Sequence, residues 1–537
     1  MIGTVLSVLW TKWTLFLCIL LFVAYKWLTS TYDFFEKKNV KHEKPKLFFG
    51  NYRGLILRQE SLFDLVKRFY LKFKDYKYYG TYEVRNPVLV ISSPEIIKQI
   101  AIRDFECFLN HPVFLDAEDE PLIGNTLFFL EDQLWKDMRG TLSHAFTGSK
   151  MRQMFQLVEE CSHNASKFLK SEAKGKGLIE MELKDLFTRF TYDVTATCAF
   201  GIQVNSLLEK NNQFYHMSRK ATNLSGFIAI KFFLFANFRK IMKFFKVKLF
   251  DQKFSRYFYS LVLETMQERA TKGIIRPDMI HLLMEARRGA LQAYDIGKSD
   301  IDEGFAIVQE SGVGRNIVNH IWTENELVAQ CFGFFIAGFE MSSALMCFCA
   351  YELMENPDIQ QKLIEEIDQV RERLGHRPLT YEILQGMQYM DMVISETLRK
   401  WPPTPATDRV CNKPYVISDE AGGTVKLHPG DVVSIPIAGL HHDPDYFPNP
   451  DKFDPERFGP ENKTQIDPFT YLPFGVGPRG CLGSRLALME TKAIIFHLLS
   501  EFTFEASPRS RIPVALKQGS FQLHAKCGFW INFKPRK

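Results

Sequence analysis

The sequence predicts a mainly α-helical fold with a small β domain, which is an α+β architecture. Most of the chain between residues 94 and 288 has helical periodicity, and alternating or short apolar runs that suit strands lie toward both ends. Hydrophobic residues make up 46% of the 537 residues, which is enough for a large core. The length alone would suggest more than one domain.

An apolar stretch over residues 5–25 opens the chain and predicts a single transmembrane anchor helix, because a membrane span needs roughly 20 such residues. A shorter and cleaner part of it would also suit the core of a cleaved signal peptide. No small-x-small cleavage site follows, and lysines from Lys26 to Lys46 would hold the rest of the chain in the cytosol. We therefore predict an uncleaved signal anchor over residues 1–28, a basic linker over 29–50 and one large domain over 51–537.

The other elements follow from periodicity and from turn residues. Residues 81–92 alternate around Asn86-Pro87 and predict a hairpin of two strands. Residues 327–351 are apolar on nearly all sides, which predicts a helix buried through the core. Prolines after Lys400 end a helix that begins near Gln385. Further helices are predicted over 357–374 and 482–502, a surface loop over 289–319, short strands up to residue 448 and terminal strands over 503–533.

Charge and cysteine content limit the function classes. The formal net charge is +5 at pH 7, which favours neither nucleic-acid binding nor an acidic interaction tail. The ten cysteines contain no C-x-x-C pair and no zinc pattern with histidine. Most of them are expected to be buried, reduced thiols in a protein that faces the cytosol.

A glycine-rich segment around Cys481 carries the functional signal. Pro478 stiffens a tight turn there, and the glycines let the backbone approach a flat partner, so that a thiolate can reach a metal without a side chain in the way. A helix is predicted to begin beside Cys481, and its amino-terminal amides favour the thiolate over the thiol. Arg479 offers a fixed guanidinium fork for a carboxylate. The glycines are Gly475, Gly477, Gly480 and Gly483.

Two other interpretations of this segment compete. One is a buried structural cysteine in a glycine-rich turn. The other is a dinucleotide fingerprint, because Gly475, Gly477 and Gly480 have its spacing. That motif needs a strand before it, whereas residues 470–474 make a poor strand, and Pro478 lies inside the loop that would wrap the pyrophosphate.

From Phe474 to Gly483 the chain reads F-x-x-G-x-R-x-C-x-G and matches every fixed position of the haem-binding signature of the cytochrome P-450 superfamily. It resembles that superfamily over essentially its whole length, and most of all insect microsomal enzymes of the detoxification clan, family nine. The resemblance implies haem b (iron protoporphyrin IX) as cofactor, Cys481 as the axial iron ligand, and Phe474 and Gly483 beside the haem. A thiolate ligand favours O–O cleavage. The finer resemblance lies in the segments 135–139, 146–152, 276–281 and 441–444.

The resemblance also assigns groups to the two haem propionates. Trp135 and Arg139 fit the W-x-x-x-R helix of the family, and Arg409 occupies another propionate position. With Arg479 this gives three arginines against two carboxylates, which suits the geometry of the guanidinium fork. Each of these arginines alone would be an ordinary surface cation.

Glu396, Arg399 and Arg457 match, in order and spacing, a buried network that holds the cysteine loop in the family. Glu396 and Arg399 are three residues apart and can share a helix face. Taken alone, such a pair is usually a solvent-exposed salt bridge that contributes little to stability. We interpret the three residues as structural and not catalytic.

The predicted core helix contains a version of the family's oxygen-binding motif. Gly338 leaves room for dioxygen, and Glu340 would be costly in so apolar a helix without a role or a partner. Met341 stands where the family usually has threonine, whose hydroxyl helps to deliver protons, and methionine has no proton to donate. Ser342 or Ser343 with an ordered water would substitute; otherwise the enzyme would release peroxide or use an already oxygenated substrate. Core packing is an equal interpretation of Met341. Gly338, Glu340 and Ser342 are the candidate catalytic residues.

The resemblance implies a monooxygenase that inserts one oxygen atom from dioxygen into a lipophilic substrate, such as an insect hormone, a xenobiotic or an insecticide. Electrons would come from NADPH–cytochrome P-450 reductase, since the chain has no flavin or NADPH motif, and cytochrome b5 is a further partner that the resemblance allows. The enzyme would lie in the endoplasmic reticulum, or microsome, membrane, with domain 51–537 as the haem-thiolate monooxygenase catalytic domain in the cytosol. No nucleic-acid partner is expected. Candidate docking cations, each equally a solvated residue, are Lys136, Lys150 and Arg152.

Three other functions stay open from the sequence. A haem-thiolate isomerase or dehydratase acting on hydroperoxides is motivated by Met341. A non-catalytic haem or ligand binder is the second, and a dinucleotide-dependent reductase is the third. Residues 227–250 mix phenylalanine with basic residues, which suits either a segment that dips into the membrane surface or ordinary helix packing.

Overall fold

Helices form most of the structure, as predicted. The computed structural model describes residues 2–222, 227–288, 305–306, 320, 322–418 and 423–536. The helices of the first part are α1 Ile2–Thr29, α2 Phe34–Lys37, α3 Arg53–Ile56, α4 Leu62–Lys72, α5 Pro94–Lys98, α6 Pro121–Gly124, α7 Asp132–Ser143, α8 Gly148–Ala173 and α9 Leu183–Ala199. Those of the second part are α10 Gln213–Thr222, α11 Phe227–Phe244, α12 Gln252–Lys272, α13 Met279–Arg287, α14 Glu324–Glu355, α15 Pro357–Leu374, α16 Tyr381–Gln385, α17 Gln388–Lys400, α18 Ile437–His441 and α19 Ser484–Glu501. Single π or 3-10 turns lie at Gln99–Arg103, Phe105–Cys107, His144–Phe146, Pro455–Phe458 and Lys463–Gln465.

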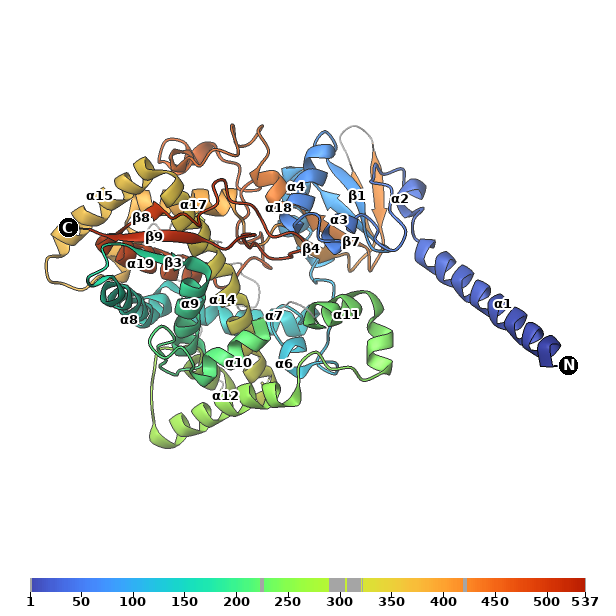
Figure 1. The fold of residues 1–537 in the computed structure, drawn as a ribbon, viewed down its shortest axis with the longest axis horizontal. Coiled ribbons are helices and arrows are strands. Elements are labelled where there is room, and N and C mark those ends of the chain that lie inside the picture. Colours follow the sequence, from blue (N-terminus) through green and yellow to red (C-terminus); the bar gives the residue numbers. More distant parts are fainter. Residues whose placement is uncertain are drawn as a thin grey trace.

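Strands from distant parts of the chain form the small sheets. One sheet has the order β1-β2-β7-β4, with β2 parallel to β7 and the other pairs antiparallel. A second has the order β3-β9-β8, and β5 pairs with β6 in a third. The first sheet lies near α1 and the second near the carboxyl terminus (Figure 1). The strands are β1 Tyr78–Glu83, β2 Asn86–Ile91, β3 Ile179–Glu182, β4 Thr407–Val410, β5 Tyr415–Ser418, β6 Thr424–Leu427, β7 Val432–Ile435, β8 Phe502–Ala506 and β9 Trp530–Pro535.

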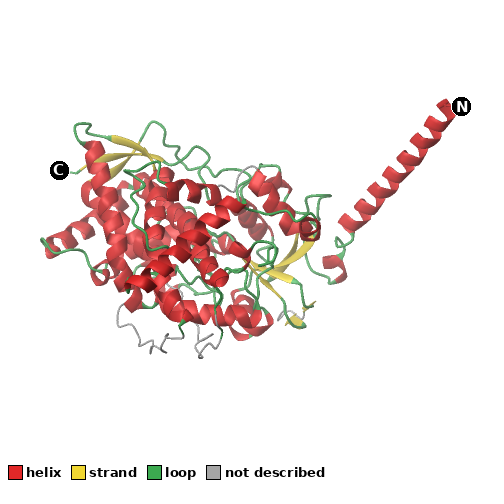
Figure 2. Cartoon of the chain, turned by 90° about the horizontal axis from the view of Figure 1, so that it is seen from below, coloured by secondary structure: helices red, strands yellow, loops and turns green. Residues whose placement is uncertain are grey.

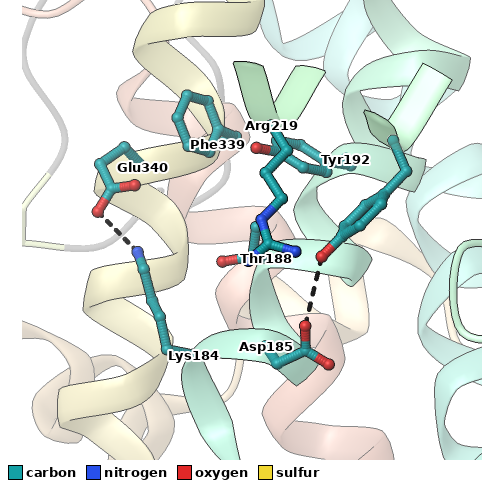
Figure 3. Close-up of a pocket in the computed structure, with 8 residues that line it drawn as sticks. Lys184, Asp185, Thr188, Tyr192, Arg219, Phe339 and Glu340 are labelled. Carbon is teal, nitrogen blue, oxygen red and sulfur yellow. Dashed lines mark hydrogen bonds and ion pairs between the residues drawn. The ribbon is translucent and has the colours of Figure 1, made fainter. Parts of the chain in front are cut away.

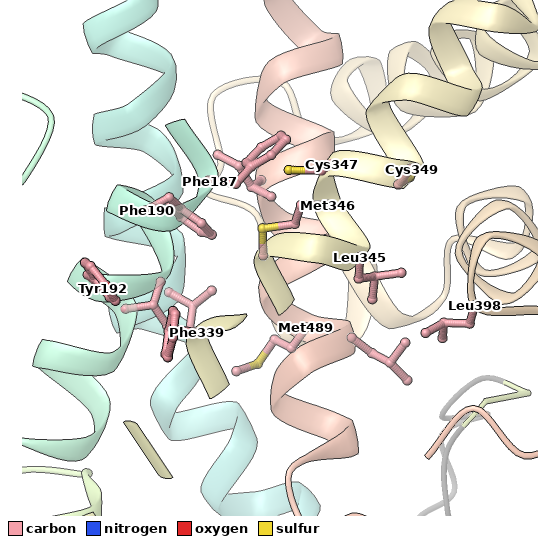
Figure 4. Packing of buried hydrophobic residues seen from close by; sticks show 14 of the residues in the cluster. Phe187, Phe190, Tyr192, Phe339, Leu345, Met346, Cys347, Cys349, Leu398 and Met489 are labelled. Atoms are coloured by element: carbon pink, nitrogen blue, oxygen red, sulfur yellow. The ribbon is translucent and has the colours of Figure 1, made fainter. Parts of the chain in front are cut away.

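The long helix α14 runs through the middle of the helical part. A capping box fixes its start, because the Thr323 side chain accepts from the Glu326 backbone while the Glu326 side chain accepts from the Thr323 backbone. Its apolar side chains pack on α9 and α19, and Figure 4 shows Met346 and Cys347 of α14 among the residues of this cluster. All ten cysteines lie in the described residues, and all of them are free thiols.

Most predicted elements are confirmed, and the differences have local causes. The hairpin over residues 81–92 is β1 and β2, and the predicted core helix is α14. The helix expected from near Gln385 begins three residues later, at Gln388, because Gly386 ends the separate helix α16 and Met387 is the N-cap of α17. The loop expected over 289–319 lies outside the described residues except for residues 305–306.

The amino-terminal helix α1 projects from the rest of the molecule (Figures 1 and 2). Its apolar side chains from Trp13 to Tyr25 are exposed, an arrangement that water does not favour. Within the described residues, only α14 meets the length and hydropathy of a membrane span, and it is largely buried in the core; the apolar part of α1, Trp13–Thr29, is shorter. Residues 38–50 pack on β1, where Gly80 N donates to Lys41 O at 2.8 Å and Gly80 O accepts from Glu43 N at 3.2 Å.

Candidate functional site

The loop around Cys481 is a closed turn that ends at the start of α19. Gly475 and Gly477 have φ angles of 75° and 72°, which residues with a side chain rarely adopt. A Cβ atom at Gly477 would also lie 2.1 Å from the carbonyl oxygen of Ala101. The backbone N–H of Cys481 donates to the carbonyl of Phe474 at 2.8 Å and closes the loop. The two glycines are therefore required by geometry, as the sequence predicted for this turn.

The Cys481 side chain is accessible, although the protein surrounds it. Burial raises the pKa of its thiol, while a hydrogen bond from the Gly483 backbone and the charge of Arg139 oppose this. The backbone near the start of α19 stabilises the thiolate as expected, but burial has the larger effect on the thiol pKa in the protein alone. A bound metal cation reverses the balance, because a coordinating thiol is deprotonated.

A buried ionic network supports this loop. Arg399 Nε lies 2.7 Å from Glu396 Oε2, and both side chains are fully buried. Arg457 Nε lies 3.5 Å from Glu396 Oε1. Arg399 Nη1 donates to the carbonyl of His441 at 2.7 Å. The three residues that the sequence grouped together thus meet in one place.

His441 connects the network to the loop. Its Nε2 accepts a hydrogen bond of 2.8 Å from the backbone N–H of Leu472, two residues before Phe474. Burial, and then the charge of Arg399, lowers the pKa of His441 to about 3, so the ring is neutral. Because Nε2 is the acceptor, the proton sits on Nδ1, which lies 3.2 Å from the carbonyl oxygen of Arg399.

Three arginines from separate elements gather beside the loop. Arg139 of α7 donates from Nη1 to the carbonyl of Gly480 at 2.9 Å. The guanidinium of Arg479 stacks over the buried Trp135 ring at 4.0 Å and donates from Nε to the carbonyl of Leu109 at 2.7 Å. Arg409 of β4 donates to Thr407 Oγ1 at 3.1 Å. The structure therefore brings together the four residues that were predicted to bind the propionates.

Burial disfavours the charges of two of these arginines. Burial, followed by the charges of Arg409 and Arg139, lowers the pKa of Arg479 to about 8. Burial lowers the pKa of Arg409 to about 10, and its buried Nε has no hydrogen-bond partner. Within the described residues, neither Arg409 nor Arg479 forms an ion pair. Buried cations of this kind call for an anion.

One face of α14 is accessible within an otherwise buried helix. Phe334, Ala337, Gly338 and Met341 are accessible or part-buried and have the spacing of one helix face, and Gly333 and Ile336 are part-buried as well. A Cβ atom at Gly338 would have only Thr195 Oγ1 within 4 Å, at 3.9 Å, so the space beside it is open. The same helix contacts the loop that holds Arg479, because Gln330 accepts from Leu127 N, and Leu127 O accepts from Arg479.

Glu340 points from α14 toward α9. Its carboxylate lies 2.7 Å from Lys184 Nζ and 3.4 Å from His524 Nε2, and Lys184 also donates to Ser343 Oγ at 2.7 Å. A cavity of about 320 Å³ begins at this pair (Figure 3), and its other lining residues are Asp185, Thr188, Tyr192, Tyr215, Arg219 and Phe339. Glu340 thus has the partner that its burial requires.

The next serine faces another direction. Ser342 is buried, and its hydroxyl is hydrogen-bonded to the Glu490 carboxyl of α19. Burial raises the pKa of Glu490 to about 8, so this carboxyl is mostly protonated at neutral pH. Neither Ser342 nor Ser343 therefore lies on the accessible face of α14.

Comparisons with known proteins decide the family. A model of the cytochrome P-450 family matches residues 41–531. The chain belongs to the cytochrome P-450 family. It is 46% identical over 535 residues to probable cytochrome P-450 9f2 of Drosophila melanogaster, which covers 98% of this chain and 100% of that protein. It is 43% identical over 547 residues to cytochrome P-450 9e2 of Blattella germanica, at 99% of each chain, and 34% identical over 508 residues to cytochrome P-450 6j1 of that species, at 95% of this chain and 94% of that protein. The predicted resemblance, family nine included, is confirmed.

The residues of this cytochrome P-450 fit the haem that the family uses. Two propionates would supply the anions that Arg409 and Arg479 lack, and the unpartnered Arg409 Nε is one of the donors in question. The accessible sulfur of Cys481 is the ligand type that haem-thiolate enzymes need. The residue types that would hold the haem are therefore present at this loop and beside it.

Sequence reasoning missed three residues of this cytochrome P-450. His441 lies in a segment that resembled family nine, but its acceptor role depends on Leu472, 31 residues away. His111 is buried, with Nδ1 2.7 Å from Asp408, the neighbour of Arg409. Lys184 pairs with Glu340 across 156 residues. No periodicity or motif reveals such pairs; the unexplained cost of burying Glu340 was the single available signal.

Proposed function

We propose that this cytochrome P-450 is a haem-thiolate monooxygenase that inserts one oxygen atom from dioxygen into a lipophilic substrate, with Cys481 as the axial ligand. One observation carries the proposal: the accessible Cys481 lies on a glycine-rich loop beside which Arg139 of α7, Arg409 of β4 and the loop's own Arg479 gather. The haem, when bound, supplies the oxygen-activating chemistry. Insect hormones, xenobiotics and insecticides are the substrate classes that the family resemblance suggests.

The cofactor would be held at both of its ends. Cys481 would bind the iron, and Phe474 and Gly483 would flank it in the loop. Arg139, Arg409 and Arg479 would bind the propionates, with Trp135 supporting Arg479 through the ring stack at 4.0 Å. Guanidinium forks suit carboxylates, because they offer two parallel donors.

Glu340 and Gly338 would serve the oxygen side. Gly338 keeps space open beside α14, and Glu340 holds an exchangeable proton site next to a cavity of about 320 Å³. Lys184 Nζ lies 2.7 Å from this carboxylate and would hold it beside the cavity, where it could relay a proton from cavity water. Ser342, through Glu490, stays a candidate for the same relay, although it faces α19.

Electrons would come from a separate reductase, and NADPH–cytochrome P-450 reductase is the partner that we propose, with cytochrome b5 as a further donor. Of the candidate docking cations, Lys136 pairs with Glu106 at 2.7 Å and Arg152 pairs with Glu382. Lys150 has no ion pair within the described residues. Lys150 is therefore the cation most available to an acidic partner.

We place the protein on the endoplasmic reticulum, or microsome, membrane, with residues 1–28, which include most of α1, as anchor, residues 29–50 as linker and the catalytic domain, 51–537, in the cytosol. The end of α1 supports this, because Trp27 stacks on Phe238 of α11 at 5.9 Å. That contact puts the anchor beside a helix with exposed apolar side chains at Ile230, Ile241 and Phe244. The two elements could enter one bilayer surface together.

The carbon-monoxide difference spectrum of the reduced protein tests the ligand. We expect a Soret band at the thiolate position for the wild type and its loss in Cys481→Ser. NADPH-dependent product with added reductase would support the monooxygenase. Turnover of a hydroperoxide without reductase, and no NADPH-dependent product, would favour the isomerase or dehydratase, which Met341 motivates. Tight ligand binding without any turnover would favour a binder.

A further inference from the structure

The oxygen-side face of α14 lacks a hydroxyl of its own. Met341 lies on that face and has no proton to donate. The two following serines point elsewhere: Ser342 bonds Glu490, and Ser343 bonds Lys184 and the carbonyl of Glu340. The hydroxyl that the structure does place at Met341 comes from another element, since Thr404 Oγ1 lies 3.9 Å from Met341 Sδ.

Thr404 is held rigidly in an accessible position. It is exposed, although its neighbours Pro403 and Pro405 are buried. Proline fixes φ, so the residues on both sides restrict the backbone here. The carbonyl of Pro405 accepts a hydrogen bond of 2.8 Å from Ala438 N. The segment then continues into β4 and reaches Arg409, so one short stretch of chain joins the face of α14 to the propionate cluster.

We propose that Thr404 is a positioning residue that supplies, from the loop before β4, the hydroxyl that Met341 does not provide. This rests on the proposed monooxygenase function. A thioether is a weak hydrogen-bond acceptor. The contact with Met341 therefore orients the Thr404 hydroxyl toward this face but leaves it able to donate to a stronger acceptor. Oγ1 can give its proton to an acceptor on that face and take another from a water, so that the hydroxyl is regenerated and bulk water is the net proton source.

Two variant pairs test the assignment in the full-length, haem-loaded protein. Thr404→Val removes the hydroxyl at nearly constant shape, while Thr404→Ser keeps it. Thr404→Ala against Thr404→Ser repeats the comparison in case valine does not fold. Thr424→Val, on the exposed start of β6, is the matched control. Haem content and the carbon-monoxide difference band show that each variant has folded.

The first readout does not depend on turnover. The C–O stretching frequency of the carbon-monoxide complex reports hydrogen-bond donors beside the ligand. We expect it to shift in Thr404→Val and Thr404→Ala, and to stay at the wild-type value in Thr404→Ser and Thr424→Val. The second readout is product per NADPH, which should fall about tenfold in the first two variants while peroxide rises. Met341→Thr should restore product yield in Thr404→Val.

The outcomes separate the two proposals. Unchanged stretching frequency and product yield in Thr404→Val, with a normal thiolate band, would overturn the role of Thr404 and leave the monooxygenase intact. A wild type without the thiolate band would overturn both. A yield that falls in Thr404→Val only for substrates without a hydroxyl would support the assignment, because a substrate hydroxyl then replaces the one that the variant lacks.

Discussion

At the scale of single residues, the site depends on groups whose ordinary properties are shifted by burial. His441 is the clearest case, because its neutral ring accepts a backbone N–H from the cysteine loop while its carbonyl accepts from Arg399. A protonated ring would lose the acceptor and would sit beside a buried guanidinium. The loop is therefore coupled to the protonation state of a residue that does not touch the haem.

His441 should make the protein sensitive to acid. Its pKa falls from 6.5 to about 3 on folding, so the unfolded chain binds more protons between these values, and stability drops as pH falls through that window. From about pH 7 to pH 5 this contributes roughly 2 kcal/mol. His441→Gln keeps a donor and an acceptor but does not titrate. Urea unfolding at the two pH values should show a smaller loss for this variant than for wild type. The exposed control His428→Gln should lose as much stability as wild type. If His441→Gln also loses as much as wild type, the coupling is contradicted.

Gly477 should be the least replaceable glycine of the cysteine loop. Gly477→Ala combines a φ of 72° with a Cβ 2.1 Å from the Ala101 carbonyl oxygen, whereas Gly430→Ala has a φ of 95° and nothing within 4 Å. Strain alone costs about 1 kcal/mol or slightly more, so Gly430→Ala should lower stability by that amount and keep its haem. Gly477→Ala should lose most of its haem, measured by Soret absorbance per protein. Equal haem content in both variants would show that the backbone at Ala101 moves to accommodate the added Cβ atom without loss of the haem site.

At the scale of elements, a set of ion pairs and hydrogen bonds connects α11 and the residues just after it to the loop before α6. We call this set of contacts the charged strap. The segment from Asp116 to Glu120 is acidic, and Arg239 pairs with both Asp116 and Asp119. Lys243 lies 2.6 Å from Glu118, and Lys248 donates to the carbonyl of Asp119 at 2.6 Å. The same loop continues to Leu127 and Leu130, whose carbonyls hold Arg479. The chain segment that pairs with α11 therefore continues to the residues that hold Arg479.

Two ion pairs of the charged strap, at Asp119 and at Glu118, should contribute differently to the free energy of unfolding. The Asp119 side chain is 3% exposed and pairs with Arg239, whereas Glu118 is 77% exposed. Asp119→Asn should therefore cost about 1–3 kcal/mol and increase proteolysis around residues 116–130, because it removes the buried one of the two carboxylates that pair with the half-buried Arg239. Glu118→Gln should cost less than about 1 kcal/mol. Thermal unfolding and limited proteolysis measure both, and equal effects would mean that the strap is only a surface feature.

The sequence was sufficient for elements with a strong local signal and insufficient for contacts across the chain. The buried helix α14 and the hairpin of β1 and β2 were predictable because periodicity and turn residues act over a few positions. The division between α16 and α17 depends on one glycine in an otherwise continuous pattern. The partners of Glu340 and His441 lie too far away in sequence for any local rule, and Thr404 meets Met341 across 63 residues. The residues of the site were therefore identifiable by resemblance, but the directions of their side chains were not.

At the scale of the whole molecule, two apolar features lie on one side of the fold. Near the end of α1, Trp27 stacks on Phe238 of α11, and at the end of α11 Phe244 and the following Phe245 are 80% and 68% exposed. Lys240 and Lys243 lie in the same helix, and cations of this kind favour an anionic lipid surface. The fold therefore presents an exposed apolar surface on α11 beside the end of α1, and we propose it as a second membrane contact.

Membrane binding should consequently survive removal of the anchor and fail when both contacts are lost. A chain without residues 1–28 should still sediment in part with vesicles that contain anionic lipid, because two exposed phenylalanines insert and basic side chains add attraction. Phe244→Asp with Phe245→Asp in that shortened chain should reduce the bound fraction severalfold, since each charge opposes insertion. Ile275→Asp is the matched control: it is 81% exposed but follows the far end of α12, about 30 Å of helix away from α11. If the shortened chain binds no vesicles, or if Ile275→Asp weakens binding as much as the phenylalanine pair, then α11 lies in solvent, and α1 alone holds the protein at the membrane.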